Sequence, residues 1–559
     1  SVASISSQEL IKIPVSDVTQ ALSGRMAGVL VQQSEGAPGS SVSIRVRGGI
    51  SITQSNDPLY IIDGFPSEDG MSTIDPAEIE TIDVLKDASA TAIYGARGAN
   101  GVVVITTKNG SKSSGKATVN FDAYWGAKTL AKKLDVLSPY EFIKLDYERT
   151  LWRIGNGDTS SDGMEAWKKR YGEYSDLESN YISRKGIDWQ EETLGRTALT
   201  QNYRISVSGK TDKMNYSLAY SYYDEEGAMV YSSNKKHNIS FNINHAVSNW
   251  LTINSRISYD QMRIEGMGTS ENTDRFNKMQ HIIQYRPTIG IQGADADLLF
   301  GEDPILADDS GNVMQNPLIS AAEEINNREW RTFQANGGAT IKLWKGFSFR
   351  STVGMRYQTR RNDIFYGADS QTAKRSSIYG SITNIESSSL QNSNVLSYSW
   401  KNSSHDVAIM VGHEFVTKWT RQFSAGATQF PNDEIGLADL SLGTPSTPTS
   451  NENYDDKLLS FFTRVNYAHM NRYLFTASIR ADGSSKFGKN NKWGYFPAVS
   501  AAWRLSEETF IKNIGIFSDL KLRIGYGLAG NNRINNYQSL AIMSSVTAAS
   551  GNGAQAGYA

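Results

Sequence analysis

The sequence predicts two structural parts, an N-terminal α/β module over residues 1–110 and a long antiparallel β-structure from about residue 116. Gly95, Gly98 and Gly101 recur every three residues among short apolar segments, which suits a backbone that turns tightly and packs closely. After residue 116, apolar and polar residues alternate with the period of a strand. The chain is also rich in aromatic residues and glycine and poor in proline, as both a membrane β-barrel and an extracellular β-sandwich are.

Composition excludes several classes of protein. The 559 residues carry a formal net charge of −2, which is too balanced for a general nucleic-acid binder. There is no cysteine, so disulfides, thiolate metal sites and cysteine nucleophiles are excluded. No segment approaches the ~18 consecutive apolar residues of a membrane helix. A membrane β-barrel gives the same hydropathy result, because its lipid-facing and lumen-facing residues alternate.

The N-terminal module is expected to alternate short helices and strands. Residues 75–107 begin with an acidic-capped turn and end in a run of apolar β-branched residues that predicts a buried strand. Gly64 is expected to end the strand before it, so that Asp63-Gly64 is a strand terminus rather than a binding site. The expected elements are a helix leading into a strand over 18–31, strands at 42–47, 58–63, 79–85 and 102–107, a helix at 87–94, and a polar linker at 108–115.

Long alternating segments follow the linker. In residues 238–244, Ile239, Phe241 and Ile243 share one strand face, and amide and hydroxyl side chains share the other. Each segment has roughly the reach of ~9–11 residues that a tilted membrane strand needs. The candidate strands are 117–125, 202–208, 215–223, 238–246, 250–259, 333–343, 347–357, 394–400, 406–415, 458–469, 473–481, 495–505 and 520–526.

The connections between these segments favour a barrel over a sandwich. Short turns are expected to alternate with long loops, as in outer-membrane barrels, whose long loops face outside. The long loops are expected to contain local helices at 139–152 and 163–171. The expected loops are 127–200, 262–330, 359–390 and 417–456.

Several motifs are long enough to carry a family resemblance. Residues 56–66 read Asn-Asp-Pro-Leu-Tyr-Ile-Ile-Asp-Gly-Phe-Pro, and residues 480–488 read Arg-Ala-Asp-Gly-Ser-Ser-Lys-Phe-Gly. In their order, these motifs resemble the SusC/RagA-like TonB-dependent outer-membrane transporters of Bacteroidetes over nearly the whole chain. The other motifs are 21–29, 36–39, 44–48, 84–90, 93–108, 492–506 and 520–532.

The resemblance implies a transmembrane antiparallel β-barrel of ~22 strands with an N-terminal α/β plug domain in its lumen. Residues 1–110 would be the plug domain, 111–115 a linker and 116–559 the N-terminal portion of the barrel. The residues that carry the plug motif are Asp63, Gly64, Lys86, Asp87, Tyr94, Gly95, Gly98 and Gly101.

The ends of the chain depart from the family pattern. No TonB box or small leading domain precedes the plug motifs, about thirteen candidate strands are found, and no aromatic-ended final strand closes the sequence. An open barrel would leave unpaired strand edges in lipid. A fragment of a longer protein is therefore expected, with the TonB-contacting residues outside it.

The resemblance also implies a function and its partners. The protein would import a large nutrient, an oligosaccharide or an oligopeptide, across the outer membrane, with a SusD/RagB-like surface lipoprotein as lid. The TonB–ExbB–ExbD complex would supply the energy, outer-membrane lipids and lipopolysaccharide would surround the barrel, and two transporter–lipoprotein pairs could form a dimer. The alternatives are a siderophore or cobalamin receptor and, from another class, a non-transporting extracellular glycan-binding β-protein or adhesin.

An enzyme is not expected, because no catalytic triad or carboxylate pair can be defended from the sequence. The glycines of the module lack the Gly-Lys-Ser/Thr ending of a phosphate loop, and the six histidines show no metal-ligand spacing. No cofactor is expected. An acidic stretch at 295–309 could hold Ca²⁺ through oxygen ligands, but it lacks EF-hand spacing, so a solvated loop is favoured.

Two groups of residues remain as site candidates. Arg45, Arg47 and Arg97 could lock the plug to barrel carboxylates, since guanidinium groups pair bidentately with carboxylates; salt bridges within the plug are the alternative. Aromatic residues of the long loops could stack against a ligand, with packing inside the loops as the alternative. These aromatic candidates are Trp152, Trp167, Trp189, Tyr285, Trp330 and Tyr366.

Overall fold

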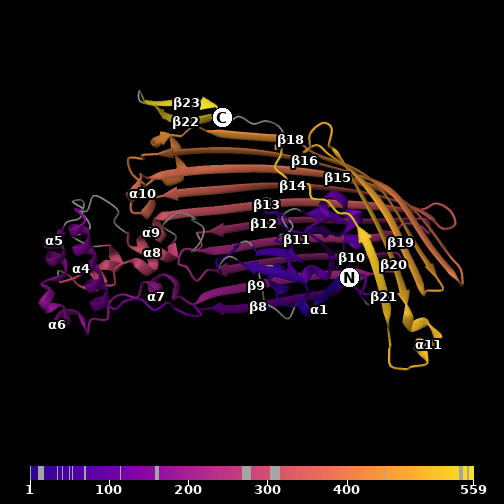
Figure 1. Ribbon diagram of the computed structural model, residues 1–559, viewed down its shortest axis with the longest axis horizontal. Coiled ribbons are helices and arrows are strands. Elements are labelled where there is room, and N and C mark those ends of the chain that lie inside the picture. Colours follow the sequence, from indigo (N-terminus) through magenta and orange to yellow (C-terminus); the bar gives the residue numbers. More distant parts are fainter. Residues whose placement is uncertain are drawn as a thin grey trace.

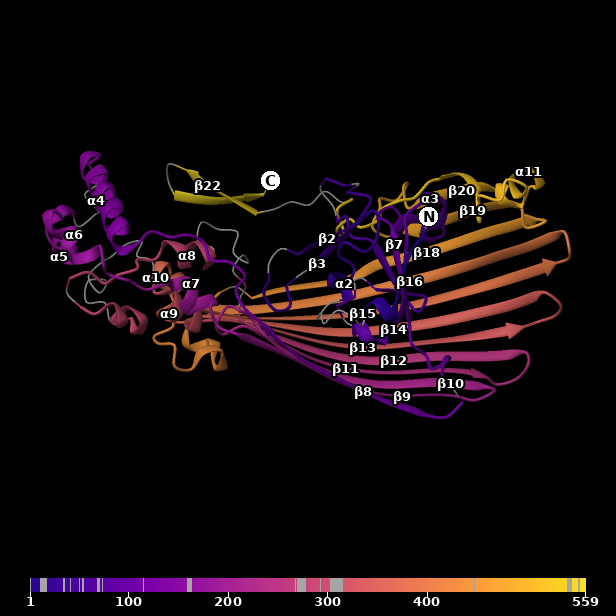
Figure 2. The same ribbon diagram turned by 90° about the horizontal axis from the view of Figure 1, so that it is seen from below.

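A long curved sheet holds a smaller N-terminal unit against its concave face, and short helices gather at one end of the sheet (Figures 1 and 2). We name these parts the large sheet and the N-terminal unit, the latter comprising the described residues before 114. This computed structural model describes residues 2–10, 18–33, 36–40, 42–49, 51–52, 55–67, 71–72, 74–113, 115–157, 163–266, 268, 278–291, 293–301, 315–446, 448–539, 545–550 and 553–558.

The N-terminal unit is built on a five-stranded sheet of order β1-β6-β7-β4-β5. β4 and β7 run parallel and the other pairs are antiparallel. Apolar side chains cover both faces, with the larger core formed around Ile79, Ile82 and Ile105. The strands are β1 (Val2–Ser6), β2 (Val29–Gln33), β3 (Val42–Val46), β4 (Leu59–Ile62), β5 (Phe65–Ser67), β6 (Ile79–Leu85) and β7 (Val102–Thr107), with β2 and β3 paired separately.

The helices of this unit are shorter than the sequence predicts. The segment 18–31 contains only α2 (Val18–Ala21) before β2 begins, and α1 is Ser7–Leu10. The expected helix 87–94 is α3 (Ala88–Thr91) followed by the 3₁₀ helix η2 (Ala92–Arg97), with a kink at Gly95. A glycine with positive φ cannot continue a helix, so the chain turns there. A further 3₁₀ turn, η1, is Pro76–Glu78.

In the part of the chain that the structure describes, the large sheet has 14 strands that follow chain order from β8 to β21, with the short β17 beside β16. All its pairs are antiparallel. Its strands are β8 (Thr118–Lys128), β9 (Ala198–Lys210), β10 (Met214–Glu226), β11 (Ser233–Ala246), β12 (Leu251–Glu265), β13 (Glu324–Lys342), β14 (Phe347–Tyr366), β15 (Tyr379–Lys401), β16 (His405–Thr428), β17 (Thr444–Pro445), β18 (Thr449–His469), β19 (Tyr473–Ser484), β20 (Trp493–Arg504) and β21 (Lys521–Gly527).

Two expected loops are wrong in extent. Most of the segment 359–390 belongs to β14 and β15, and much of 417–456 belongs to β16 and β18. These extensions stay paired in register, for example Arg361 with Asn384. They carry polar residues on both faces, so the alternation of apolar residues that marks a lipid-facing strand ends before the hydrogen-bonded strand does.

The large sheet turns its apolar face outward. On β11, Ile239 and Phe241 are 44% and 37% exposed, whereas Asn238 and Ser240 are 1% and 2% exposed. The polar side chains are buried because they face the N-terminal unit. A soluble sandwich would bury the apolar face in a core. An exposed apolar face and a polar face covered by the N-terminal unit are instead what a barrel wall has when another domain fills its lumen.

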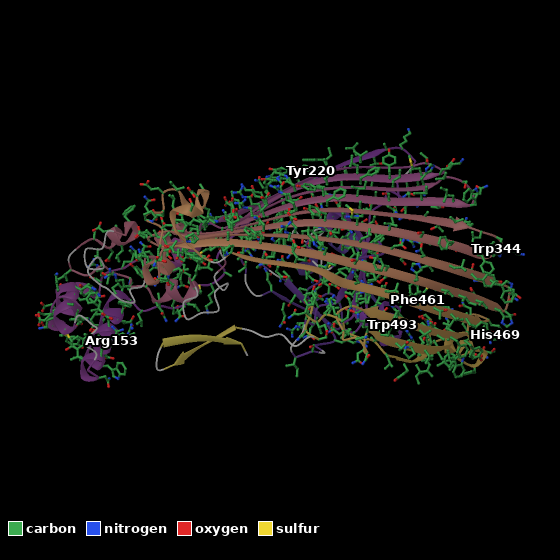
Figure 3. The ribbon with its side chains drawn as sticks, turned by 90° about the horizontal axis from the view of Figure 1, so that it is seen from above. Arg153, Tyr220, Trp344, Phe461, His469 and Trp493 are labelled. Carbon is green, nitrogen blue, oxygen red and sulfur yellow. The ribbon has the colours of Figure 1, made fainter. Side chains whose placement is uncertain are left out.

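The two ends of the large sheet differ. At one end, which we call the turn end, short connections such as 211–213 and 343–346 join neighbouring strands. Exposed Trp250, Trp344 and Trp400 lie at this end, where Figure 3 labels Trp344, as in the aromatic girdle of a membrane barrel. The opposite end, the loop end, carries the long connections 129–197, 266–323, 367–378 and 429–448.

The loops at the loop end have small cores of their own. One core contains Trp167 and Tyr171, and another contains Trp189 and Tyr285. Among the described residues, no helix has the length and apolar character needed to cross a membrane. The helices are α4 (Pro139–Gly155), α5 (Gly163–Tyr171), α6 (Leu177–Tyr181), α7 (Trp189–Leu194), α8 (Lys278–Gln284), α9 (Pro317–Glu323) and α10 (Gln371–Arg375), and α11 (Thr509–Lys512) lies at the turn end.

Within the described part of the chain, β8 and β21 each pair on one side only, so the sheet is open. A separate hairpin of β22 (Ser545–Ser550) and β23 (Gly553–Tyr558) follows. The strands that the described residues contribute to the large sheet are thus fewer than the ~22 of a complete barrel of this size class.

Candidate functional site

The N-terminal unit meets the inner face of the large sheet through two clusters of charged side chains. One is centred on Arg256 of β12 and the other on Arg480 of β19. Both arginines are almost fully buried. Buried charges require paired partners, so these clusters are where the interface is electrostatically specified.

The Arg256 cluster joins β12 to two carboxylates of the N-terminal unit. Arg256 Nη1 lies 3.2 Å from Asp63 Oδ2, and Arg256 Nη2 lies 3.3 Å from Glu78 Oε2. The hydroxyl of Ser240 on β11 also donates to Glu78, at 2.7 Å. The charges are placed the other way round from the expectation. An arginine of the large sheet pairs with carboxylates of the N-terminal unit, whereas arginines of the N-terminal unit were expected to pair with carboxylates of the barrel.

Local structure presents both carboxylates toward Arg256. Asp63 and Gly64 have φ values of 49° and 91° and form the two-residue turn between β4 and β5, which suits an Asp-Gly pair. The Asp63 carboxylate also accepts from the backbone N–H and hydroxyl of Thr107, at 2.9 and 2.7 Å. As expected, Asp63-Gly64 ends the strand β4, and the Asp63 side chain also pairs with Arg256, which the sequence did not predict.

Burial raises the pKa of Glu78 above its ordinary value of 4.5, and the nearby Arg256 opposes this only in part. Between the ordinary and the raised pKa, folded Glu78 holds a proton that the unfolded chain has released. Stability should therefore fall as the pH rises through that interval. We expect Glu78→Gln, which cannot titrate, to show a flatter pH dependence of the unfolding midpoint than the unaltered protein from about pH 4.5 upward. Thermal unfolding in detergent across that pH range measures this, and parallel pH profiles would contradict it.

The Arg480 cluster joins β16 and β19 to the segment around Gly95. Arg480 Nε pairs with Asp482 at 2.6 Å, and Arg480 Nη2 lies 3.2 Å from Glu414 Oε1. Arg97 of the N-terminal unit pairs with the same Glu414 oxygen. Arg480 also donates to the carbonyl oxygen of Ile93, at 2.8 Å. One carboxylate thus bridges an arginine from each part of the molecule.

The backbone of the glycine motif completes this contact. The N–H of Ala96 donates to Asp482 Oδ2 at 2.6 Å, and the carbonyl oxygen of Gly95 accepts from the N–H of Gly530 at 3.1 Å. Gly95 has a φ of 51°, and a Cβ there would overlap Asp482 Oδ2 and lie 2.7 Å from Arg480 Cδ. The lack of a side chain at this position is what permits the close approach.

The other two glycines of the motif serve packing inside the N-terminal unit. A Cβ on Gly98 would lie 2.6 Å from the carbonyl oxygen of Thr91, and Gly101, with a φ of 87°, lies against Val46. Tyr94 packs in the smaller core, where burial raises the pKa of its hydroxyl. Lys86 donates to the carbonyl oxygen of Ala27.

The three arginine candidates lie in different surroundings. The Arg97 ion pair crosses from the N-terminal unit to the large sheet, as described above. Arg47 is 53% exposed at its side chain and pairs at 2.7 Å with Asp87 of the same unit, the alternative that the sequence left open. Asp87 in turn lies 3.9 Å from Arg523 of β21. Arg45 is exposed on β3 and forms no ion pair with a described carboxylate.

The aromatic candidates are mostly packed inside the loops. Trp167, Trp189 and Tyr285 are buried in the loop cores, whereas Trp152 on α4 is exposed. Trp330 and Tyr366 are half-buried on strands β13 and β14 rather than in a loop. Arg360 stacks on the ring of Trp330 at 4.8 Å, and Tyr366 stacks on Tyr379.

Two substitutions distinguish a tryptophan that is buried in a loop core from one that is exposed. Trp189 is 4% exposed and donates from Nε1 to the carbonyl oxygen of Arg286 at 2.8 Å, whereas Trp152 is 71% exposed. We expect Trp189→Ala to destabilise the local loop core by about 3–5 kcal/mol. Trp152→Ala should leave the protection of α7 and α8 against hydrogen exchange unchanged. Hydrogen exchange of α7 and α8 measures the difference, and equal protection in both variants would contradict it.

The acidic stretch has no sign of a metal site in the residues that the structure describes. Arg184 pairs with Asp295 at 2.7 Å, and Asp297 accepts from the N–H of Ala294 at 3.1 Å. Glu302, Asp303, Asp308 and Asp309 lie outside the described residues. Among those described, no group of three or more histidine or acidic side chains could hold a metal ion.

Sequence reasoning missed the sheet side of both clusters: Arg256, Ser240, Glu414, Arg480 and Asp482. Arg480 and Asp482 lie in the motif 480–488, whose alternation places two charges on the same strand face. Two charges on the lumen face of a strand, next to a glycine-rich partner, are the signal that could have found them.

Comparison with known proteins agrees with this architecture. Residues 1–102 match the family model of the TonB-dependent receptor plug domain. The chain is 30% identical to TonB-dependent receptor P3 of Formosa agariphila, over 99% of this chain and 51% of that protein. It is also 30% identical to TonB-dependent receptor SusC of Bacteroides thetaiotaomicron, over 96% of this chain and 52% of that protein.

Solved structures show the same likeness. The structure of the RagAB peptide transporter matches with a TM-score of 0.80 and 26% identity, over 100% of this chain and 63% of that chain. The ferric citrate transporter FecA shares the fold at a TM-score of 0.53 and 12% identity, over 91% of this chain and 61% of that chain.

The fold is therefore that of a TonB-dependent receptor, a plug domain set against a barrel wall. More narrowly, the sequence is similar to that of SusC and the structure to that of the RagAB peptide transporter, which confirms the resemblance that the motifs indicated. It spans about half the length of the curated relatives that it matches, 51% and 52% for the two named above.

Proposed function

We propose that this chain is part of a TonB-dependent importer in the outer membrane of a Gram-negative bacterium. In this proposal residues 1–110 are the plug, 111–115 a linker and 116–559 part of the transmembrane β-barrel. The observation that carries the proposal is the polarity of the large sheet, whose exposed face is apolar and whose polar face holds the N-terminal unit. A wall between lipid and an aqueous lumen needs that arrangement.

A non-transporting adhesin or glycan-binding β-protein fits this polarity poorly. Such a protein would pack its apolar strand faces in a core, yet Ile239 and Phe241 are exposed. The likeness to FecA concerns the fold alone and gives no argument for an iron complex as cargo. The named relatives are receptors, and nothing in the described residues calls for catalysis.

The two charged clusters would keep the plug in the closed state. Arg97, with Glu414, and Arg256, with Asp63 and Glu78, would be the locking residues. These contacts are few and polar, so a pulling force can break them one after another without exposing a large apolar surface. TonB–ExbB–ExbD would supply that force. No hydrolysis within this chain would then be needed.

The cargo would be a large nutrient, an oligosaccharide or an oligopeptide. A SusD/RagB-like surface lipoprotein would cover the loop end, and two such pairs could assemble as a dimer among lipids and lipopolysaccharide. Support comes from the likeness to SusC and to the RagAB peptide transporter. Exposed Trp152 would be available to that partner or to the cargo.

Purification of the whole protein from native outer membrane in mild detergent tests the proposal. Mass spectrometry should find a co-purifying surface lipoprotein, together with a trapped oligosaccharide or oligopeptide. Uptake of that molecule by cells should require TonB. Recovery in the soluble fraction, or uptake that continues without TonB, would overturn the proposal.

A further inference from the structure

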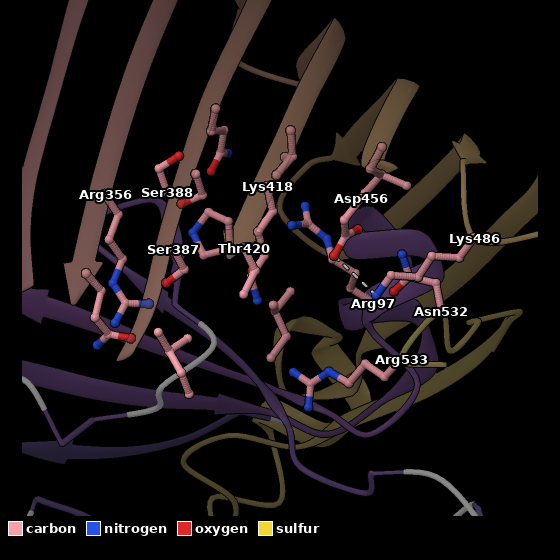
Figure 4. A pocket seen from close by; sticks show the side chains of 18 of the residues that line it. Arg97, Arg356, Ser387, Ser388, Lys418, Thr420, Asp456, Lys486, Asn532 and Arg533 are labelled. Carbon is pink, nitrogen blue, oxygen red and sulfur yellow. Dashed lines mark ion pairs between the residues drawn. The ribbon is translucent and has the colours of Figure 1, made fainter. Parts of the chain in front are cut away.

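The two faces of β14, β15 and β16 should differ in polarity if the large sheet is a barrel wall. Their inner face is polar, as a lumen requires, and together with β18 it lines a cavity of about 210 Å³ beside the N-terminal unit (Figure 4). Their outward face should be apolar throughout. Instead, a group of polar side chains interrupts the apolar surface in its middle.

The interruption consists of four side chains on three neighbouring strands. Strand register places Ser351 of β14 opposite Asn394 of β15, and Asn394 opposite His413 of β16. Asn392 lies on the same face of β15, because side chains two residues apart on a strand point the same way. All four side chains are partly exposed. We call Ser351, Asn392, Asn394 and His413 the polar island.

Exposed apolar side chains surround the polar island and show that it faces outward. On β16, His413 lies between Val411 and Phe415 in the alternation, and both of these are exposed. On β15, exposed Leu390 and Leu396 lie on either side of the two asparagines. On these strands, the outward face therefore has a polar centre inside an apolar rim.

The polar island also lies midway across the apolar band. Along β16, His413 is midway between Val407, which is opposite Trp400 at the turn end, and Trp419 toward the loop end. Aromatic residues at both ends of the outward band mark the two interfaces of a membrane. The polar island would therefore face the hydrocarbon core, where polar side chains are costly and usually have a function.

Three other strands show the usual outward pattern. Ile205 on β9, Leu218 on β10 and Phe241 on β11 are exposed on the same face of the large sheet. Cross-strand register places Leu218 opposite Phe241, so large apolar side chains lie side by side there. The polar island is thus a local feature of β14, β15 and β16.

The hydrogen bonds of the polar island are incomplete within the sheet. Asn394 Nδ2 donates to Asn392 Oδ1 at 2.6 Å and lies 3.3 Å from His413 Nε2. Asn392 Nδ2 donates to the carbonyl oxygen of Thr352 at 3.1 Å. Asn394 Oδ1 accepts no hydrogen bond from the residues that the structure describes. An unpaired acceptor in hydrocarbon costs free energy, which a protein partner with a donor would recover.

A margin of small residues extends the polar island onto β13. Ala335, Gly337 and Ala339 alternate with inward residues on the outward face of β13, and Ala339 is opposite Ser351. Small side chains let two backbones come close in a membrane, and amide side chains both donate and accept hydrogen bonds. The surface is therefore self-complementary, as an interface about a two-fold axis must be.

We propose that the polar island and its small-residue margin are the surface through which two copies of this chain associate within the membrane. This inference rests on the proposed function, because it takes the large sheet to be a membrane wall. Asn394 of each copy would form hydrogen bonds with the polar island of the other. A lipid acyl chain fits this surface poorly, because it supplies no hydrogen-bonding group.

Cysteine cross-linking of the whole protein in native outer membrane tests the proposal. This chain has no cysteine, so Ser351→Cys adds a thiol to the polar island, and Ala477→Cys adds one to the outward face of β19. With a membrane-permeable bismaleimide, we expect Ser351→Cys to give a covalent dimer, and Ala477→Cys and the unaltered protein to give none. Equal dimer yields at both positions, a cross-link from Ser351→Cys to a different protein, or no cross-linked product would overturn the proposal.

Substitutions that make the polar island apolar test its contribution to association. Asn394→Leu combined with His413→Phe should weaken dimerisation of the detergent-purified protein by about tenfold, which analytical ultracentrifugation measures. Thr463→Val removes a hydroxyl from the outward face of β18 outside the polar island and should leave dimerisation unchanged. Unchanged dimerisation in a folded double variant would overturn the proposal; if that variant does not fold, the cross-linking result decides.

Failure of this inference and failure of the proposed function give different results. TonB-dependent uptake by a protein that is monomeric in the membrane would overturn the inference and leave the proposed function intact. Recovery of the protein in the soluble fraction would overturn both.

Discussion

Arg256→Met is expected to destabilise the seating of the N-terminal unit by about 3–5 kcal/mol, since removal of one partner leaves buried carboxylates uncompensated. Arg256 lies within ion-pair distance of both Asp63 and Glu78, and all three groups belong to the interface. Loss of the guanidinium should loosen the unit from β12. Limited trypsin digestion of the detergent-purified protein, together with chemical unfolding, measures the change.

Two comparisons make this result specific. Arg263→Met removes an exposed arginine further along the same strand and should have little effect on either measurement. The triple variant Arg256→Met, Asp63→Asn, Glu78→Gln removes the charges together and should recover much of the loss, because no unpaired charge is then buried. Unchanged protease resistance in Arg256→Met alone would show that this cluster does not hold the unit.

The second large effect is expected from Gly95→Ala. A Cβ at this position would overlap the Asp482 carboxylate and lie 2.7 Å from Arg480 Cδ, so either the N-terminal unit or β19 must move. Movement would break the hydrogen bond from Ala96 to Asp482 and disturb the pairing of Glu414 with its two arginines. We expect a loss of several kcal/mol, comparable to that of an overpacked and unpaired buried site.

Gly48→Ala is the matched control for Gly95→Ala. Gly48 also has a positive φ, of 94°, but a Cβ there would meet nothing within 4 Å. It should cost only the backbone strain of about 1–2 kcal/mol. The two unfolding midpoints, measured in the same detergent, should therefore differ clearly. Equal midpoints would mean that the close approach of Gly95 to the sheet is not a constraint on stability.

The architecture was largely predictable from sequence because its signals are local. The alternation of Ile239 and Phe241 with polar residues marks β11, and the glycine spacing marks the kink at Gly95. The extent of β14 and β15 was not predictable, because beyond the apolar belt polar residues occupy both faces and the alternation ends, although pairing with the neighbouring strand continues.

The site was less predictable because its pairs are distant in the chain. Arg256 and Asp63 are 193 positions apart, and Arg97 and Glu414 are 317 apart. Arg47-Gly48 and Arg97-Gly98 are equivalent as local sequence, yet the ion pair of Arg47 is with Asp87 inside the N-terminal unit, whereas that of Arg97 crosses to the sheet. Only the orientation of the unit inside the curved sheet distinguishes them.

By itself, the sequence determined the α/β character of the N-terminal unit, the antiparallel strands and the kinship to SusC/RagA-like receptors, because periodicity and motif order are properties of neighbouring residues. The tertiary structure alone decided which charges meet, that Asp63 pairs with Arg256, and that Trp189 is a core residue while Trp152 is not. It also decided that polar side chains from three strands gather at one place on the outward face of the large sheet. Such properties depend on how distant segments come together, and strand pairing and burial, not local sequence, set that arrangement.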